Sequence, residues 1–169
     1  MAKEDARIPD LREPLRLIGM LADIGAPILD LTIGNPYYNP QFGRPFERAI
    51  QGAELPDEHP LVGTARIIHI TRVVQEAYPR LPLIAFGYGW LRHLMPQVAA
   101  EAIATGGAAM IGQGRGAFAY PDSPRDIIST GKMAENKCCL TCSLCTQYMR
   151  DGRNTGCAVR DAAIYAKKS

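Results

Sequence analysis

The sequence predicts an α/β fold built on a parallel sheet, and three observations carry that prediction. First, short apolar runs containing glycine recur three times along the chain, at 28–34, 82–89 and 108–116. Second, segments with the apolar spacing of a helix precede or separate these runs. Third, the chain has 169 residues, 47% of them hydrophobic and 21% charged, which is enough for one ordinary core. Strands that alternate with helices are typical of parallel sheets with right-handed crossover connections.

The first helix–strand unit is followed by a long loop. Residues 11–24 repeat apolar side chains at helical spacing, namely Leu11, Leu15, Ile18 and Leu21. Gly25 ends this predicted helix, and ILDLTIG at 28–34 then predicts a buried parallel strand. The next 26 residues, 35–60, are rich in Pro and Gly and predict a loop. Loops of that length inside a compact domain are usually functional or mobile.

The rest of the chain continues the alternation. Residues 61–78 predict an amphipathic helix, 82–89 a second buried strand, and 95–107 a helix that ends at a glycine pair. Residues 108–116 predict a third strand that runs into a glycine-rich turn, and 122–130 predict a short helix. Three strands make a narrow sheet with two open edges. We therefore expect the sheet to be completed by another copy, by a separate subunit, or by further sequence of a longer protein.

Charge and hydropathy exclude several classes of function. The net charge is +2 with no dense basic run, so the sequence carries no nucleic-acid footprint. No stretch approaches the roughly 18 apolar residues of a membrane span. The first ten residues, MAKEDARIPD, are charged and lack the apolar core of a secretory leader. The sequence thus predicts a cytoplasmic protein that binds neither nucleic acid nor membrane.

All five cysteines lie between residues 137 and 157. Cys139, Cys142 and Cys145 have the spacing C-x2-C-x2-C, and Cys157 follows after eleven residues. An odd number of cysteines in a reducing compartment argues against a disulfide framework and for a metal. Four thiolates suit either structural zinc or an iron–sulfur cluster, but zinc sites usually pair two C-x2-C knuckles. Cys138 is predicted to be a bystander, although its register with Cys139 is ambiguous.

Two glycine turns follow consecutive predicted strands and form a candidate phosphate site. The first holds Gly87, Tyr88 and Gly89, and the second holds Gly112, Gly114 and Arg115. Ligands of α/β proteins bind at the carboxyl ends of the strands, where glycines let backbone N–H groups approach phosphate oxygens. The alternative is that both are tight strand-to-helix turns and that Arg115 forms a surface ion pair.

In their order along the chain, these features resemble the C-terminal part of the FMN-dependent Old Yellow Enzyme family of NADH:flavin oxidoreductases. The resemblance covers roughly residues 15–160 and is strongest to the iron–sulfur branch, which includes 2,4-dienoyl-CoA reductase and trimethylamine dehydrogenase. The stretch GGAAMIGQGRGAFAYPDSPRDI, then KCCLTCSLC, then TGC carries it. The family's G-R-x(4–5)-P-D stretch is matched by Gly114, Arg115, Pro121 and Asp122. Its four-cysteine cluster motif is matched by Cys139, Cys142, Cys145 and Cys157.

This resemblance implies a partial TIM barrel of about three β/α units, equivalent to strands six to eight. We expect residues 1–132 to form it and residues 133–169 to form a cysteine-rich cluster loop with a C-terminal helix. The implied cofactors are FMN, with its phosphate on the two glycine turns, and a [4Fe–4S] cluster on the four cysteines. Tyr37 and Tyr38, just beyond the first strand, could contact flavin or substrate, or could only pin the loop.

The implied function is that of a component of an oxidoreductase that reduces an activated alkene or related substrate with electrons from NAD(P)H. A partner domain that binds NAD(P)H or FAD would supply those electrons. The chain departs from the family in lacking the early strands that carry its catalytic Tyr and His. It also has Arg160-Asp161 where the family usually shows Asn-Pro after the last cysteine. The alternative is a non-catalytic partner or remnant that is stabilised by zinc or a cluster and binds no flavin.

Overall fold

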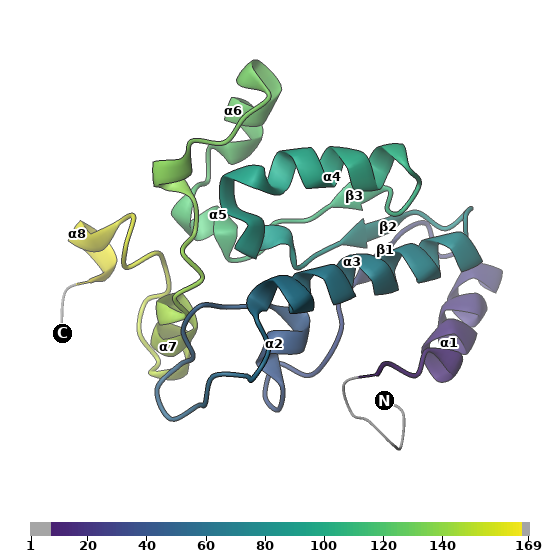
Figure 1. Ribbon diagram of the computed structural model, residues 1–169, viewed down its shortest axis with the longest axis horizontal. Coiled ribbons are helices and arrows are strands. Elements are labelled where there is room, and N and C mark those ends of the chain that lie inside the picture. Colours follow the sequence, from purple (N-terminus) through teal and green to yellow (C-terminus); the bar gives the residue numbers. More distant parts are fainter. Residues whose placement is uncertain (1–7, 167–169) are drawn as a thin grey trace.

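The computed structural model describes residues 8–166, and Figure 1 shows their arrangement. The elements are, in chain order, α1 (Arg12–Asp23), β1 (Leu29–Leu31), α2 (Pro40–Gly43), α3 (Pro60–Ala77), β2 (Leu83–Ala85), the 3₁₀ segment η1 (Tyr88–Leu94), α4 (Met95–Ala104), β3 (Met110–Ile111), α5 (Gly116–Ala119), α6 (Ser123–Thr130), η2 (Glu135–Lys137), α7 (Leu144–Arg150) and α8 (Ala162–Tyr165). The sequence predicts that residues 1–10 are not a secretory leader. Residues 1–7 of this stretch lie outside the described residues.

The three strands form one parallel sheet in the order β1-β2-β3, which confirms the predicted α/β class. Leu29 pairs with Leu83, and Ile84 pairs with Met110. The strands are shorter than predicted, because the chain leaves the extended conformation near the glycines. Gly34 and Gly87 have φ angles of 76° and 91°, which lie in the left-handed region and end the strands.

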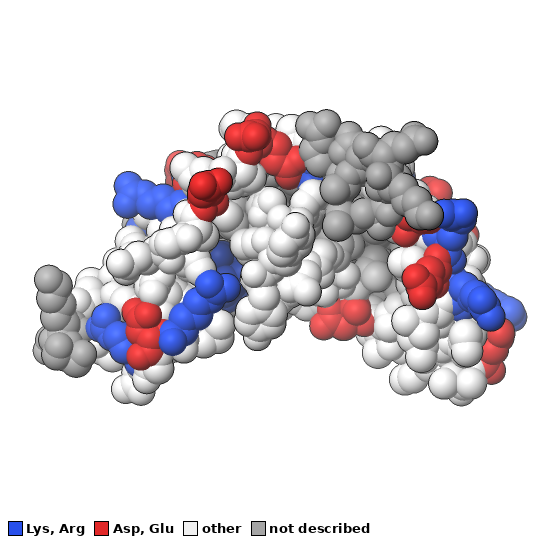
Figure 2. All heavy atoms as spheres, turned by 90° about the horizontal axis from the view of Figure 1, so that it is seen from below, with Lys and Arg blue, Asp and Glu red and all other residues white. Residues whose placement is uncertain are grey.

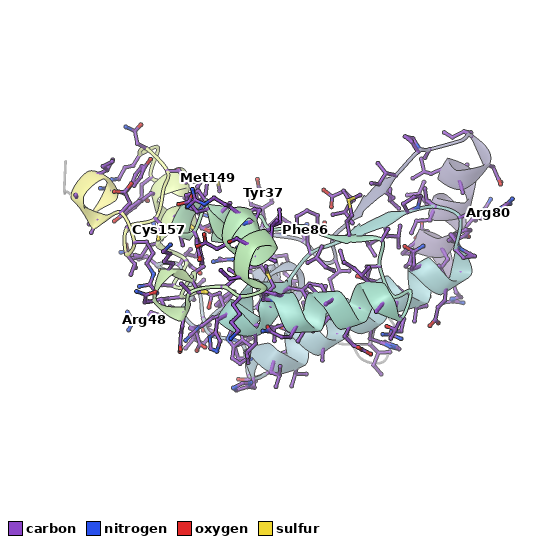
Figure 3. All side chains as sticks on the ribbon, turned by 90° about the horizontal axis from the view of Figure 1, so that it is seen from above. Tyr37, Arg48, Arg80, Phe86, Met149 and Cys157 are labelled. Carbon is purple, nitrogen blue, oxygen red and sulfur yellow. The ribbon has the colours of Figure 1, made fainter. Side chains whose placement is uncertain are left out.

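Helices α3 and α4 cover one face of the sheet (Figures 1 and 3). Leu83 and Ala85, which are fully buried, alternate with Ile84 and so point to the same face. Leu83 packs in a cluster with Val74 of α3, and Ala85 packs in a cluster with Ala102 of α4. The buried core therefore lies between the sheet and these two helices.

The opposite face of the sheet is not covered by any helix within residues 8–166. Asp30, Ile84 and Met110 stand in register across the three strands and point to this face. The exposed fraction of Met110 is 46%, although it is a large apolar residue. Figure 2 shows a hollow on this side of the molecule, between its two ends. The sheet thus has a solvent-facing surface that includes apolar side chains.

The cysteine-rich segment lies beside the long loop between β1 and α3, at one end of the molecule (Figure 1). The Glu47 N–H donates to the Thr141 carbonyl oxygen at 3.2 Å, and the Gln51 N–H donates to Gln147 Oε1 at 2.9 Å. Segments about 95 residues apart in the chain are thus held together. The proposed boundary between residues 132 and 133 stays a prediction. Among the described helices, none has the length and apolar character needed to cross a membrane.

Candidate metal centre and anion cavities

One small cavity is lined by four of the five cysteines, Cys139, Cys142, Cys145 and Cys157. The fifth, Cys138, is buried in the core, where its thiol donates to the Ala134 carbonyl oxygen at 3.4 Å. Burial raises the pKa of this thiol, so Cys138 is held in its neutral form. The structure therefore places Cys139 at the cavity and Cys138 away from it, as the sequence motif predicts.

The backbone around these cysteines is folded so that N–H groups point at sulfur. The Thr141 N–H donates to Cys139 Sγ, and the Arg160 N–H donates to Cys157 Sγ, each at 3.3 Å. Thr141 and Ser143 are buried and adopt positive φ angles of 50° and 60°, which are unfavourable for residues with a Cβ. Such strain persists only where the surroundings enforce it and is common at functional sites.

The donor chemistry of this cavity fits a thiolate-bound group, since four cysteines line it and two of them already accept backbone N–H groups. Within residues 8–166, however, no group of three or more Cys, His, Asp or Glu is gathered closely enough to hold a single metal ion. As the side chains stand, the cavity measures about 20 Å³, roughly the space of one water. A metal or cluster would therefore require these partly exposed side chains to rearrange around it.

A second cavity, of about 160 Å³, lies at the carboxyl ends of β2 and β3 and is lined by both glycine turns. Its lining includes the predicted residues Gly87, Gly89, Gly112, Gly114 and Arg115. Tyr88 is placed differently, because its side chain is 1% exposed and packs in the core with Ala85. The side chain of Tyr88 therefore cannot contact a ligand in this cavity.

The glycines of the two turns have different roles. A Cβ on Gly87 would lie 2.5 Å from Ile67 Cδ1, and a Cβ on Gly112 would lie 2.1 Å from the Phe86 ring. These two glycines are required by the packing of the fold. A Cβ on Gly89 or Gly114 would instead meet nothing within 4 Å. At these two positions the missing side chain leaves open space beside the cavity.

Arg115 lies between the two cavities and lines both of them, together with Cys139. Its guanidinium donates to the Thr146 hydroxyl of α7, and among residues 8–166 it forms no ion pair such as the alternative interpretation expects. Desolvation, followed by the neighbouring charge of Arg44, lowers the pKa of Arg115 to about 10. Arg115 thus stays charged at neutral pH, although it is partly buried beside a second cation.

Arg44, which the sequence did not single out, also lines both cavities. Its Nη1 donates to Ser143 Oγ at 3.5 Å, and its Nη2 is buried with no hydrogen-bond partner among the described residues. The only sequence signal was the short Gly43-Arg44-Pro45 run within the long loop. A lone arginine in a loop could be assigned to the site only once the fold was known.

A third and larger cavity, of about 690 Å³, adjoins the other two and falls in the size range of small-molecule sites. Tyr37 lines it from the loop after β1 and Met149 lines it from α7 (Figure 3). Tyr38 does not share it, because it lines a separate apolar cavity of about 350 Å³ next to α1. The structure therefore separates the two tyrosines proposed to contact substrate and leaves only Tyr37 near the cysteines.

No family model, curated protein or solved structure matches this chain.

Proposed function

We propose that this chain is a component of an FMN- and [4Fe–4S]-dependent oxidoreductase and that its sheet is equivalent to the last three strands of a TIM barrel. One observation carries the proposal. The cavity of the four cysteines adjoins the cavity of the two glycine turns, and Cys139 and Arg115 line both. A cluster and an FMN bound in these cavities would be neighbours, and electron transfer between them would depend on the flavin ring, which must lie near the cluster.

Cys139, Cys142, Cys145 and Cys157 would hold the cluster as thiolates. The N–H groups of Thr141 and Arg160 would remain hydrogen-bonded to sulfur, which is one way in which proteins set the potential of a cluster. Arg160 also ties the two ends of the motif together, because its guanidinium donates to the Cys138 carbonyl oxygen at 2.9 and 3.1 Å. This contact gives a structural role to Arg160, which stands where the family usually has Asn-Pro.

The two glycine turns would hold the FMN phosphate. Gly89 and Gly114 leave room for phosphate oxygens to approach the backbone, and Arg115 supplies a positive charge at the same cavity. When bound, the two cofactors would together pass electrons from NAD(P)H to an activated alkene, and this redox chemistry belongs to them and not to the side chains. The contribution of the chain is to position the cofactors and to stabilise their negative charge.

The remaining barrel strands would be supplied by another polypeptide segment, in a second copy or a separate subunit. This part of the proposal is supported by the uncovered sheet face, on which Ile84 and Met110 lie in register. A partner domain that binds NAD(P)H or FAD would deliver the electrons. Residues that contact the flavin ring and transfer protons to the substrate would come from the added strands.

A pair of cysteine variants tests the metal assignment. Cys142→Ala removes a proposed ligand, so anaerobically purified protein should lose its iron and its visible absorbance near about 400 nm. Cys138→Ala is the matched control, since its thiol lies in the core, and it should keep the iron content of the unaltered chain. Equal iron content in both variants would contradict the assignment. Loss of one zinc per chain from Cys142→Ala would show a structural metal instead.

A further inference from the structure

The cavity of about 690 Å³ beside the cysteines has a strongly unbalanced charge. Arg44, Arg115 and Arg150 line it, each from a different part of the chain. Among the described residues that line it, none is Asp or Glu. A cleft lined by charges of one sign raises the local concentration of ligands of the opposite sign. The cavity therefore favours an anionic ligand.

Two of these arginines form no ion pair with a carboxylate among the described residues. Arg115 donates to the neutral hydroxyl of Thr146, and Arg44 donates to the neutral hydroxyl of Ser143. Arg44 Nη2 has no partner among the described residues, although the atom is buried. Burying cations beside one another is unfavourable unless something compensates their charge. A bound oxyanion would compensate it and would satisfy the free donor.

Apolar and aromatic side chains elsewhere in the lining indicate what the rest of the ligand would contact. Phe46 and Ile50 come from the long loop, Met149 comes from α7, and Tyr37 adds an exposed ring at the rim (Figure 3). We propose that this cavity binds an organic anion, with a carboxylate or phosphate head group at the arginines and an apolar body against these side chains. This inference rests on the proposed function and takes the anion to be the substrate of the oxidoreductase.

The proposed anion site overlaps the phosphate site at the glycine turns and extends beyond it. Arg44 and Arg115 line both cavities, whereas Arg150 lines only the larger one. Arg150 is exposed on the last turn of α7 and is far from the glycines in sequence. A variant of Arg150 therefore tests the larger cavity without altering the residues proposed for the cluster or for FMN.

The test is isothermal titration of the full-length, anaerobically purified chain with benzoate and with its neutral analogue benzamide. Benzoate should bind at least tenfold more tightly than benzamide. Arg44→Gln should weaken benzoate binding about tenfold or more, because charge-assisted hydrogen bonds are lost, and Arg150→Gln should weaken it severalfold. Arg48→Gln is the matched control, since Arg48 is an exposed arginine of the same loop that lies outside the lining of the cavity (Figure 3). Phenyl phosphate then distinguishes a preference for phosphate from a preference for carboxylate.

Four results would overturn the inference. Three of them are equal binding of benzoate and benzamide, benzoate binding that is unchanged in both Arg44→Gln and Arg150→Gln, and an equal loss in Arg48→Gln. Benzoate binding that saturating FMN abolishes would also overturn it, by assigning the arginines to the cofactor phosphate. Iron and flavin are measured on the same samples. Anion binding by protein without iron or flavin would support this site while contradicting the proposed function, so the two failures are distinguishable.

Discussion

At the scale of single residues, the glycines of the two turns show which positions serve the fold and which serve a ligand. Gly87 combines a φ of 91° with a Cβ position 2.5 Å from Ile67. Gly89, two residues later, has open space at the same position and lines the cavity at the strand ends. Adding a methyl group at these two neighbouring glycines is therefore expected to have very different effects on stability.

Gly87→Ala should destabilise the chain by about 3 kcal/mol, because the residue must adopt a left-handed conformation and its methyl group overlaps Ile67. Gly89→Ala should change the free energy of unfolding by less than about 1 kcal/mol. Urea denaturation followed by circular dichroism measures both. A loss in Gly89→Ala as large as that in Gly87→Ala would show that the open space is needed by the fold.

The sequence allowed the cysteines to be predicted as one site because their spacing keeps them close together whatever the rest of the chain does. It could not identify Arg44, whose position at the cavities depends on how a 26-residue loop packs against a segment about 100 residues away. The sequence also gives no means of telling Tyr37 from Tyr38. Adjacent residues of an irregular loop point in different directions, and here they reach different cavities.

At the scale of elements, one buried amide joins α3 to the start of β2. Gln75 Nε2 donates to the carbonyl oxygens of Tyr78 and Leu81, at 3.2 and 3.0 Å. Gln75 Oε1 accepts from the Leu83 N–H at 3.1 Å. The side chain thus satisfies three backbone groups in the turn that leads from the helix into the sheet.

Gln75→Met, which keeps the volume of the side chain but removes these bonds, should destabilise the chain by about 2 to 3 kcal/mol. The cost arises because buried backbone groups lose their partners. Glu76→Met is the matched control, since Glu76 is exposed, and it should cost less than about 0.5 kcal/mol. A chemical denaturation curve of each variant measures these changes in the free energy of unfolding. Similar midpoints for the two variants would contradict the role of Gln75.

A second junction joins α6 to the beginning of the cysteine-rich segment and is sensitive to pH. The buried Tyr120 hydroxyl donates to Asp126 and accepts from the Ala134 N–H at 3.3 Å. The Tyr120 hydrogen bond, aided by Lys137, lowers the pKa of Asp126 below its ordinary value. Because the folded state has the lower pKa, the contribution to stability is present above about pH 4, the unfolded value, and is lost as the pH falls through the folded value.

Tyr120→Phe should therefore flatten the loss of stability on acidification between about pH 5 and pH 2, since the hydroxyl that stabilises the ionised carboxylate is gone. Asp126→Asn should flatten it at least as much, because it also removes the ion pair with Lys137. Unfolding free energies measured by denaturant titration across this range test both. An unchanged acid profile in both variants would show that this junction is not the titrating one.

The helices were predicted more accurately than the strands, for a physical reason. The expected helix at 61–78 is α3 at Pro60–Ala77, because a helix repeats its apolar pattern over several turns. The expected strand at 82–89 is only Leu83–Ala85, because Tyr88 is buried in the core as part of η1, not of a strand. Apolar residues in an irregular segment and in a strand have the same composition, so a short apolar run cannot set the boundary between them.

At the scale of the whole molecule, the uncovered face of the sheet bears most directly on whether the chain associates. One face packs on α3 and α4, while Asp30, Ile84 and Met110 stand in register on the opposite face. A partial barrel would present such a face to its missing strands. Open sheet edges and exposed apolar surface promote association.

The chain should therefore sediment as an oligomer or aggregate and not as an 18.4 kDa species. Met110→Lys places a charge on the uncovered face and should shift the distribution toward smaller species. Ile128→Lys is the control, because Ile128 is 86% exposed on α6, away from the sheet, and it should leave the distribution unchanged. A monodisperse monomer of the unaltered chain in analytical ultracentrifugation would count against the partial-barrel proposal.

The central claim is that the four cysteines and the two glycine turns hold a cluster and a flavin side by side. The measurement that tests it most directly is the content of iron, acid-labile sulfide, zinc and released flavin in one anaerobically purified sample. The account predicts about four irons and four sulfides per chain, together with FMN. A colourless protein with one zinc per chain and no flavin would contradict it and would make the cysteines a structural metal site.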